Sequence, residues 1–264
     1  MSRFPEKIVC LSNESVDILI RLSCADRVVG APAESLSRGI SNAASVGSYG
    51  TIDIDRVTNL EPDIVFSYSD FQHRFVLPLL QREIPVMTFS QSSLEGIFDS
   101  IRIIGNVAGV AQRGEQLVRE LRESIRNFSS KNRINTAPPR VYFEEWNDPM
   151  VTGTRWVSEM IEIAGGRDIF SEKASHTQFI ERHVLNRDIL EKNPDIIFAS
   201  WCGKKVDTEE IRSRQGWERL SAVKNNRIFE LPGESVLQPG PGILRGIEIM
   251  HNRILYDASG VFLS

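Results

Sequence analysis

One short phrase occurs twice in this chain, and it constrains the fold more than any other feature. Pro-Asp-Ile-Val-Phe at 62–66 returns as Pro-Asp-Ile-Ile-Phe at 194–198, in a chain of 264 residues. Each copy follows a short amphipathic segment and runs into a loop with an aromatic residue, Tyr68 or Trp201. Pro-Asp before an apolar run is a common transition from helix to strand in any α/β protein, but the match in order and context favours a repeated unit. The repeat predicts two similar lobes, one in each half of the chain.

Strand-like and helix-like segments alternate through both halves. Apolar runs predict strands at 7–12, 27–31, 44–48, 63–68, 84–89, 140–146 and 227–231. Amphipathic patterns predict helices between them, among others at 54–60, 156–164, 181–193 and 243–256. Parallel strands joined by helical crossovers are typical of α/β proteins. Ligands of open α/β sheets collect at the carboxyl ends of the strands, where Tyr68 and Trp201 are expected.

A helix near the middle of the chain is predicted to connect the two lobes. Leu117, Leu121, Ile125 and Phe128 form its apolar stripe, and a polar, proline-ended break follows at 129–140. The expected division is an N-terminal lobe at 1–111, a connector at 112–130 and a C-terminal lobe at 131–264. An ordinary crossover helix would show the same pattern. Because a helix with a buried face resists bending, ligand binding is expected to change the angle between the lobes little.

Composition excludes several classes of protein. The net charge is −4 with both signs mixed along the chain, which disfavours nucleic acid or an anionic membrane as partner. No apolar run reaches the length of a membrane span. Three cysteines without a Cys-x-x-Cys pair, and four scattered histidines, indicate neither a disulfide framework nor a metal site. Without an apolar leader at the start, the expected location is cytoplasmic; a periplasmic or cell-surface location is the alternative if a leader was removed.

Four stretches, at 7–19, 46–70, 141–170 and 194–242, resemble the periplasmic-binding-protein group that serves ABC importers of cobalamin, haem and iron–siderophores. Phe-Glu-Glu-Trp at 143–146, the 200–206 loop and Leu-Gln-Pro-Gly-Pro at 237–241 look most like the cobalamin-binding proteins. The resemblance implies an α/β fold of two Rossmann-like lobes with parallel sheets, joined by one long helix. It further implies a carrier without catalytic residues that holds a corrinoid in a cleft between the lobes.

The resemblance also carries over the residues expected to contact the ligand. A corrin ring has apolar faces and a rim of neutral amides, so aromatic walls and hydrogen-bond acceptors suit it. The expected walls are Tyr49, Tyr68, Trp146 and Trp201, and the expected acceptors are Glu144, Glu145, Glu234 and Gln238.

Docking on a transporter is less well supported by the sequence. The family's first lobe carries a glutamate for this purpose, but the corresponding stretch here, 71–74, has no acidic residue. Glu218 is the candidate for the docking acid of the second lobe. An ABC permease is therefore expected only as a possible partner.

Two other functions stay open. A ferric siderophore or haem would favour converging cations, for which Arg38, Arg74, Arg155, Lys204 and Lys205 are candidates. A corrinoid-handling enzyme would need catalytic groups, and Glu144 with Glu145 could be read as an acid–base pair. Adjacent residues of a strand point to opposite faces, however, which disfavours joint catalysis by these two carboxylates.

Overall fold

The repeated Pro-Asp phrase occupies the same place in two separate parallel sheets. We describe residues 4–40, 42–131 and 137–255 from a computed structural model of the chain. The Asp63 carboxylate accepts the backbone N–H groups of Glu6 at 2.7 Å and Lys7 at 2.8 Å, just before the first strand. Asp195 likewise accepts the backbone N–H of Arg140 at 2.9 Å, at the start of the second sheet's first long strand. Each aspartate thus joins two neighbouring strands at their amino ends.

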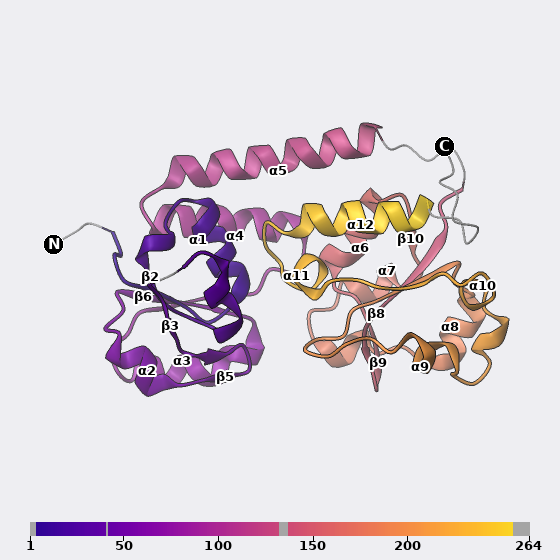
Figure 1. Ribbon diagram of the computed structural model, residues 1–264, viewed down its shortest axis with the longest axis horizontal. Helices are drawn as coiled ribbons and strands as arrows, with labels where there is room; N and C mark the ends of the chain where they lie inside the picture. The colour runs from indigo at the N-terminus through magenta and orange to yellow at the C-terminus, as the bar shows by residue number, and fades with distance from the viewer. Residues whose placement is uncertain (1–3, 41, 132–136, 256–264) are drawn as a thin grey trace. The chain divides into compact units, whose positions relative to one another are not determined.

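The chain divides into two compact units, which confirms the expected two-lobed α/β class. The first comprises Met1–Gln91 and Glu95–Arg122, and the second Ser92–Leu94 and Glu123–Ser264. The boundary falls inside helix α5, Ala111–Lys131, which appears where the sequence predicts the connector (Figure 1). The limits set for the lobes at 111 and 131 remain predictions.

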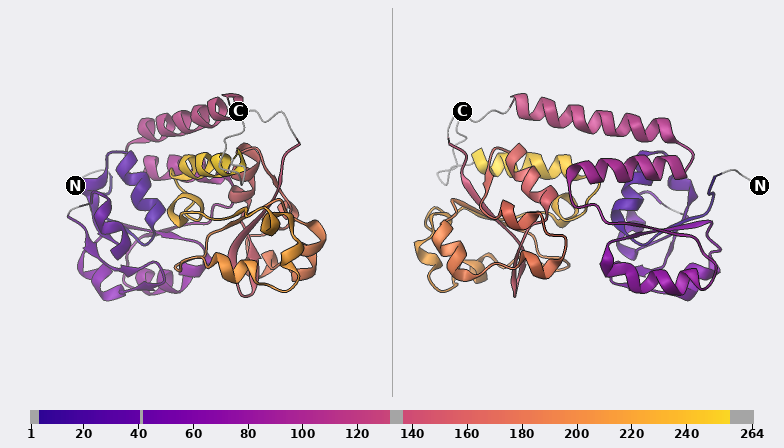
Figure 2. Two further views of the ribbon diagram at one scale, coloured as in Figure 1. Left: turned by 45° about the vertical axis from the view of Figure 1, so that its right-hand side comes forward. Right: turned by 180° about the vertical axis from the view of Figure 1, so that it is seen from behind.

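The first unit is built on a five-stranded parallel sheet of order β3-β2-β1-β6-β7. Helices α1 and α4 cover one face of this sheet, and α2 and α3 cover the other (Figures 1 and 2). Its elements, with α4 included, are β1 (Ile8–Cys10), α1 (Asn13–Arg21), β2 (Val28–Ala31), β3 (Ala44–Ser45), β4 (Gly47–Ser48), β5 (Thr51–Ile52), α2 (Ile54–Asn59), β6 (Ile64–Tyr68), the 3-10 turn η3 (Asp70–Gln72), α3 (His73–Leu80), β7 (Val86–Phe89) and α4 (Leu94–Val107).

The second unit has a parallel sheet of order β10-β8-β11-β12, with β9 antiparallel on β8. Helices α6 and α12 pack together on one face, and α8, α9 and α10 lie on the other (Figure 2). Its elements are β8 (Arg140–Asn147), β9 (Met150–Thr152), α6 (Arg155–Ile163), β10 (Arg167–Asp168), α7 (Ser171–Ala174), η4 (Phe179–Arg182), α8 (Asn186–Lys192), β11 (Ile196–Ala199), α9 (Thr208–Arg212), η5 (Trp217–Arg219), α10 (Ser221–Lys224), β12 (Ile228–Glu230), α11 (Gly233–Val236) and α12 (Ile243–Leu255).

The sequence prediction of one helix over 181–193 is wrong. The segment holds the end of η4, an extended piece around Val184, and α8. Val184 donates its backbone N–H to Met150 O at 2.9 Å, and His183 bridges to Val151. Pairing with β9 therefore outweighs the local helical pattern, because the fully buried Val184 gains both a hydrogen bond and a place in the core. The predicted last helix is present as α12, and its expected final residue, Tyr256, lies outside the described residues.

Glycines allow two helices of the first unit to approach closely. A Cβ atom built on Gly105 of α4 would lie 3.2 Å from the Cα atom of Gly114 in α5. Helix α4 continues through Gly105, and the missing side chain at this position makes room for the neighbouring backbone. Among the described residues, no helix is both long and apolar enough to cross a membrane.

Glu14, at the start of α1, is buried at the carboxyl end of β1. Burial raises the pKa of its carboxyl from 4.5 to about 7, against the lowering effect of a hydrogen bond from Ser12. Asp17 nearby raises the pKa further, whereas Arg38 lowers it. Between about pH 4.5 and pH 7, the Glu14 carboxyl therefore keeps its proton in the folded state and loses it in the unfolded chain.

We expect Glu14→Gln to change the pH dependence of stability. The pH-dependent cost of burying Glu14 in the free energy of unfolding is absent below about pH 4.5. It grows as the pH rises and levels off above the folded-state pKa of about 7. The variant should therefore gain stability relative to the natural chain as the pH rises through this window, by on the order of 3 kcal/mol. Denaturant unfolding of both proteins across the window measures the difference, with the exposed Glu61→Gln as control. A gain that does not vary with pH would contradict the assignment.

Candidate ligand-binding site

Two of the expected aromatic residues lie near each other in the first unit. Tyr68 ends β6, and Tyr49 forms the turn between β4 and β5. The Tyr49 hydroxyl lies 3.4 Å from the Ser69 hydroxyl, so the β4–β5 turn contacts the loop that follows β6. Both tyrosines are half-buried. The carboxyl end of the first sheet therefore gathers aromatic surface where the sequence predicts a ligand.

Phe71 extends this aromatic surface and was missed as a site residue in the sequence. Its ring stacks on Tyr49 with centroids 5.6 Å apart and planes 2° from parallel, and half of the residue is exposed. Arg74 lies 5.1 Å from the centroid of the same ring and donates a hydrogen bond to Gly50 O. The sequence offered one signal for Phe71, since it is an aromatic residue three positions after the strand end at Tyr68. Its stacking partner Tyr49 could not be recognised, because it is distant in the chain.

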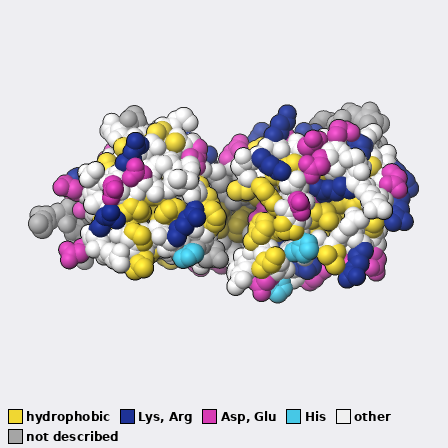
Figure 3. All heavy atoms as spheres, turned by 90° about the horizontal axis from the view of Figure 1, so that it is seen from below, with side chains coloured by type: hydrophobic (Ala, Val, Ile, Leu, Met, Phe, Trp, Pro, Cys, Tyr) yellow, Lys and Arg dark blue, Asp and Glu magenta, His cyan; other side chains and the backbone are white. Residues whose placement is uncertain are grey.

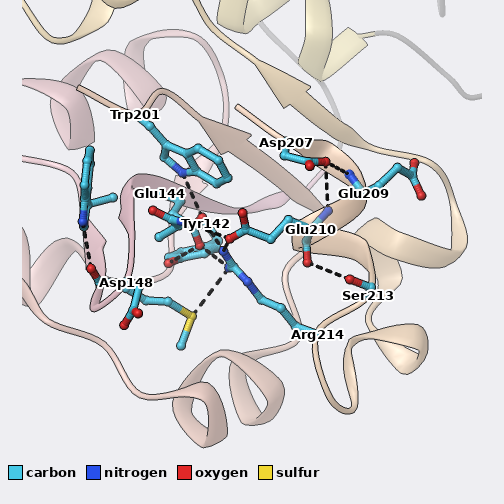
Figure 4. A network of polar contacts seen from close by, with 12 residues as sticks. Tyr142, Glu144, Asp148, Trp201, Asp207, Glu209, Glu210, Ser213 and Arg214 are labelled. Carbon is cyan, nitrogen blue, oxygen red and sulfur yellow. Dashed lines mark hydrogen bonds and ion pairs between the residues drawn. The ribbon is translucent and has the colours of Figure 1, made fainter. Parts of the chain in front are cut away.

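In the second unit, a buried carboxylate organises the carboxyl edge of the sheet (Figure 4). Glu144 has no exposed surface. Its Oε1 accepts the Trp201 indole N–H at 3.1 Å, and its Oε2 accepts the Tyr142 hydroxyl at 3.1 Å. Arg214 binds both oxygens, at 2.9 and 2.5 Å. The protein itself uses both oxygens, so this geometry gives no support to the expectation that Glu144 accepts hydrogen bonds from a ligand, and that role stays a prediction.

Glu144 stabilises the charged form of Arg214. Burial acts to lower the pKa of Arg214, but the hydrogen bonds and charge of Glu144 outweigh it and raise the pKa. Burial, with the charge of Glu144, raises the pKa of Tyr142 well above its ordinary value, so its hydroxyl keeps the proton that it donates. The indole of Trp201 is thus supported by a charge-assisted network rather than by apolar packing alone.

The two expected tryptophans of this unit share a lysine. Lys204 Nζ lies 4.5 Å from the centroid of the Trp201 ring and 5.1 Å from that of Trp146, within the range of cation–π attraction. The backbone N–H of Lys204 donates to Trp201 O at 3.3 Å, and Gly203 between them has φ of 75°. A turn with a left-handed glycine therefore brings Lys204 back over the indole that precedes it.

A hollow of about 410 Å³ opens beside these residues. It lies at the carboxyl ends of β11 and β12, and its lining residues are Ser200, Trp201, Lys204, Glu230, Leu231, Pro232, Gly233 and Glu234. Trp201 contributes little surface to the hollow, since the residue is 4% exposed. Glu234 is exposed, and Glu230 accepts the backbone N–H of Val206 at 3.0 Å. The hollow combines one indole, one ammonium group and two carboxylates.

The remaining expected residues lie outside this hollow. Glu145 is half-buried and binds Arg182 through two contacts of 2.6 and 3.0 Å, so its acceptors are largely occupied. Gln238 is half-buried just beyond α11. Glu218 is exposed next to the buried Trp217, which leaves its docking role a prediction.

A second hollow, of about 340 Å³, touches the other end of the Glu144 network. Its lining residues are Asn147, Asp148, Pro149, Met150, His183, Asn186, Arg214 and Gln215. Arg214 also lies 3.6 Å from the Met150 sulfur. Glu144 therefore connects an indole in the first hollow with a guanidinium in the second.

Metal or thiol chemistry finds little support in the geometry. Among residues 4–40, 42–131 and 137–255, no group of three or more His, Cys, Asp or Glu side chains is arranged to hold a metal ion. Burial raises the pKa of the Cys202 thiol, and the charge of Glu145 raises it further. A reactive thiolate needs the opposite shift.

Comparison with known proteins identifies the family. The sequence profile described as periplasmic binding protein matches residues 8–235. The chain belongs to this family. Family members are solute-binding proteins without catalytic activity, and the substrate-binding proteins of ABC transporters among them take a small-molecule ligand and have a permease as partner. The expectations of a binding protein rather than an enzyme, and of this fold, are confirmed.

Individual relatives differ in the ligand that their names state. The chain is 23% identical to the uncharacterized ABC transporter substrate-binding lipoprotein YvrC of Bacillus subtilis, over 96% of this chain and 81% of that one. It is 22% identical to a vitamin B12-binding protein of Vibrio parahaemolyticus, over 92% and 86%. The structure of S. aureus IsdE complexed with heme matches with a TM-score of 0.81 at 19% identity, over 97% of this chain and 100% of that one. These comparisons fix the fold and leave the ligand to the chemistry of the site.

We expect Glu144→Ala to destabilise the second unit. The substitution leaves the Arg214 guanidinium partly buried without its carboxylate, and breaking one side of a buried pair costs about 3–5 kcal/mol. Urea unfolding followed by circular dichroism measures the loss. The matched control is Glu210→Ala, because Glu210 contacts the same guanidinium at 3.6 Å from an exposed position and should cost under about 1 kcal/mol. Equal losses in the two variants would show that Glu144 has no special structural role.

Proposed function

We propose that this solute-binding protein takes cobalamin or a related corrinoid as its ligand and presents it to an ABC permease. The observation that supports this proposal most directly is the composition of the hollow at the ends of β11 and β12. Trp201 offers an aromatic surface, while Lys204 and Glu234 offer a donor and an acceptor within the same space. The half-buried tyrosines at the strand ends of the first unit add aromatic surface of the same kind.

A neutral ligand rim suits this mixture better than an anionic one. The peripheral amides of a corrin both donate and accept hydrogen bonds, so they can use an ammonium group and carboxylates side by side. The carboxylates of haem or the oxyanions of a ferric siderophore would instead meet two glutamates and one lysine. Repulsion in a partly desolvated hollow would oppose their binding.

Three of the other cations considered for an anionic ligand, Arg38, Arg74 and Arg155, have partners in the protein. Arg38 pairs with Asp17 at 3.0 Å, and Arg155 pairs with Glu159 at 2.9 Å. Arg74 lies over two phenylalanine rings and donates to a backbone carbonyl. On the face that Figure 3 shows, charges of both signs are interspersed with hydrophobic side chains in each unit. The expected convergence of cations for a siderophore therefore lacks support within the described residues.

Titration with alternative ligands tests the proposal directly. We expect calorimetry to show one cyanocobalamin bound per chain, and the absorbance of the corrin to stay with the protein after desalting. Haem and a ferric siderophore should bind more weakly under the same conditions. Retention of haem, without any corrinoid, would overturn the proposal in favour of a haem carrier. Turnover of the bound corrinoid would overturn the assignment as a carrier.

The charge of the hollow offers a second test. Glu234→Lys should weaken cyanocobalamin binding by about tenfold or more, since a charged hydrogen-bond acceptor is replaced by a second cation. The same variant should improve the binding of haem, whose carboxylates would then meet two ammonium groups. Glu191→Lys makes the same change of net charge at an exposed position of α8 and serves as control. Equal effects of the two substitutions on calorimetric affinity would place Glu234 outside the ligand site.

A further inference from the structure

Gln72 is a fully buried amide that joins three loops of the first unit. It is the last residue of η3, and its side chain has no exposed surface. Its Nε2 donates to Leu11 O at 2.7 Å and to Tyr49 O at 3.0 Å. Its Oε1 accepts the backbone N–H of Tyr68 at 2.9 Å. The loop after β1, the β4–β5 turn and the end of β6 thus meet on one side chain.

Few side chains could satisfy these three backbone groups at once. A primary amide has two donor hydrogens and an acceptor oxygen, and both kinds of group are used here. A carboxylate supplies acceptors alone, and an apolar side chain of the same length supplies nothing. Without the amide, Leu11 O and Tyr49 O would each lose a donor in a buried place, which is costly.

Two of the three contacts are to residues that the sequence predicts to contact the ligand. The backbones of Tyr49 and Tyr68 are bound by opposite ends of the same amide group. Phe71, whose ring stacks on Tyr49, precedes Gln72 in the chain. The separation between the two tyrosines therefore depends on a side chain that has no exposed surface of its own.

We propose that Gln72 is the positioning residue for the aromatic surface that Tyr49 and Tyr68 form in the first unit. It acts through the backbones of Tyr49 and Tyr68 and does not touch the ligand. This inference rests on the proposed function for its binding readout. The alternative is that Gln72 stabilises the unit generally and has no particular effect on the site.

The variant Gln72→Glu separates these roles through its pH dependence. When the introduced carboxyl is protonated, it can accept the Tyr68 N–H and donate one hydrogen bond to a carbonyl, which restores part of the network. When it is ionised, it faces two carbonyl oxygens without a donor, and its pKa should be raised by burial. Charged groups that contact these loops include Glu34, which accepts the Tyr49 N–H at 3.1 Å, and Arg74, bonded to Gly50 O. Asp70 and His73 flank Gln72 in the chain, and Glu14 follows the loop after β1.

We expect Gln72→Glu to bind cyanocobalamin about tenfold more weakly than the natural chain at about pH 8.5, and to recover most of this loss at about pH 5. Gln72→Met should bind cyanocobalamin more weakly than the natural chain at both pH values. Ser100→Ala is the matched control, because it removes another buried hydrogen bond of this unit, from Ser100 Oγ to Ile97 O at 2.8 Å, far along the chain from the site. It should leave the affinity unchanged. A loss in Ser100→Ala as large as in Gln72→Met would overturn the positioning role.

Amide hydrogen exchange of the unliganded protein tests the same inference without a ligand. The amide of Tyr68 should exchange about tenfold faster in Gln72→Met, while the amides of Leu117 and Leu121 in α5 keep their rates. Unchanged exchange at Tyr68, or a uniform increase over the whole unit, would overturn the inference. If the natural chain binds no cyanocobalamin, the proposed function fails, and the exchange rates still decide the role of Gln72.

Discussion

Both sheets depend on one interaction, the hydrogen bonding of an aspartate to the amino end of the neighbouring strand. Asp63 sits between Lys7 and the start of β6, and Asp195 between Arg140 and the start of β11. A shift of one residue in strand pairing would turn every side chain to the other face. The two aspartates therefore help to fix the register in which β6 and β11, the strands that lead to Tyr68 and Trp201, pair with their neighbours.

The two edges are supported by different polar chemistry. A neutral amide, Gln72, holds the loops of the first unit through their backbones, whereas the second unit uses the ion pair of Glu144 and Arg214 to hold an indole. In both cases the supporting atoms are saturated by the protein. Under the proposed function, the half-buried tyrosine rings present apolar surface to the ligand, and exposed acids such as Glu234 provide polar recognition.

Much of the fold could be predicted from the sequence because its signals are local. The Pro-Asp repeat, the apolar runs and the stripe of α5 all lie within short windows. The role of Glu144 could not be predicted, since it is set by Arg214 at a distance of 70 residues in the chain. Similarly, the stack of Phe71 on Tyr49 and the break of the predicted helix at Val184 depend on partners that only the folded chain brings near.

The long span of the Glu144 network has a consequence for the order in which the site is completed during synthesis. Within the described residues, the side chain of Gln72 hydrogen-bonds to earlier residues, so these contacts can form once the first unit, which extends to Arg122, has left the ribosome. The indole of Trp201 gains its full support only after Arg214 has emerged, and Glu234 follows later still. Since domains fold as their residues become available, the edge of the first sheet is complete well before the edge of the second.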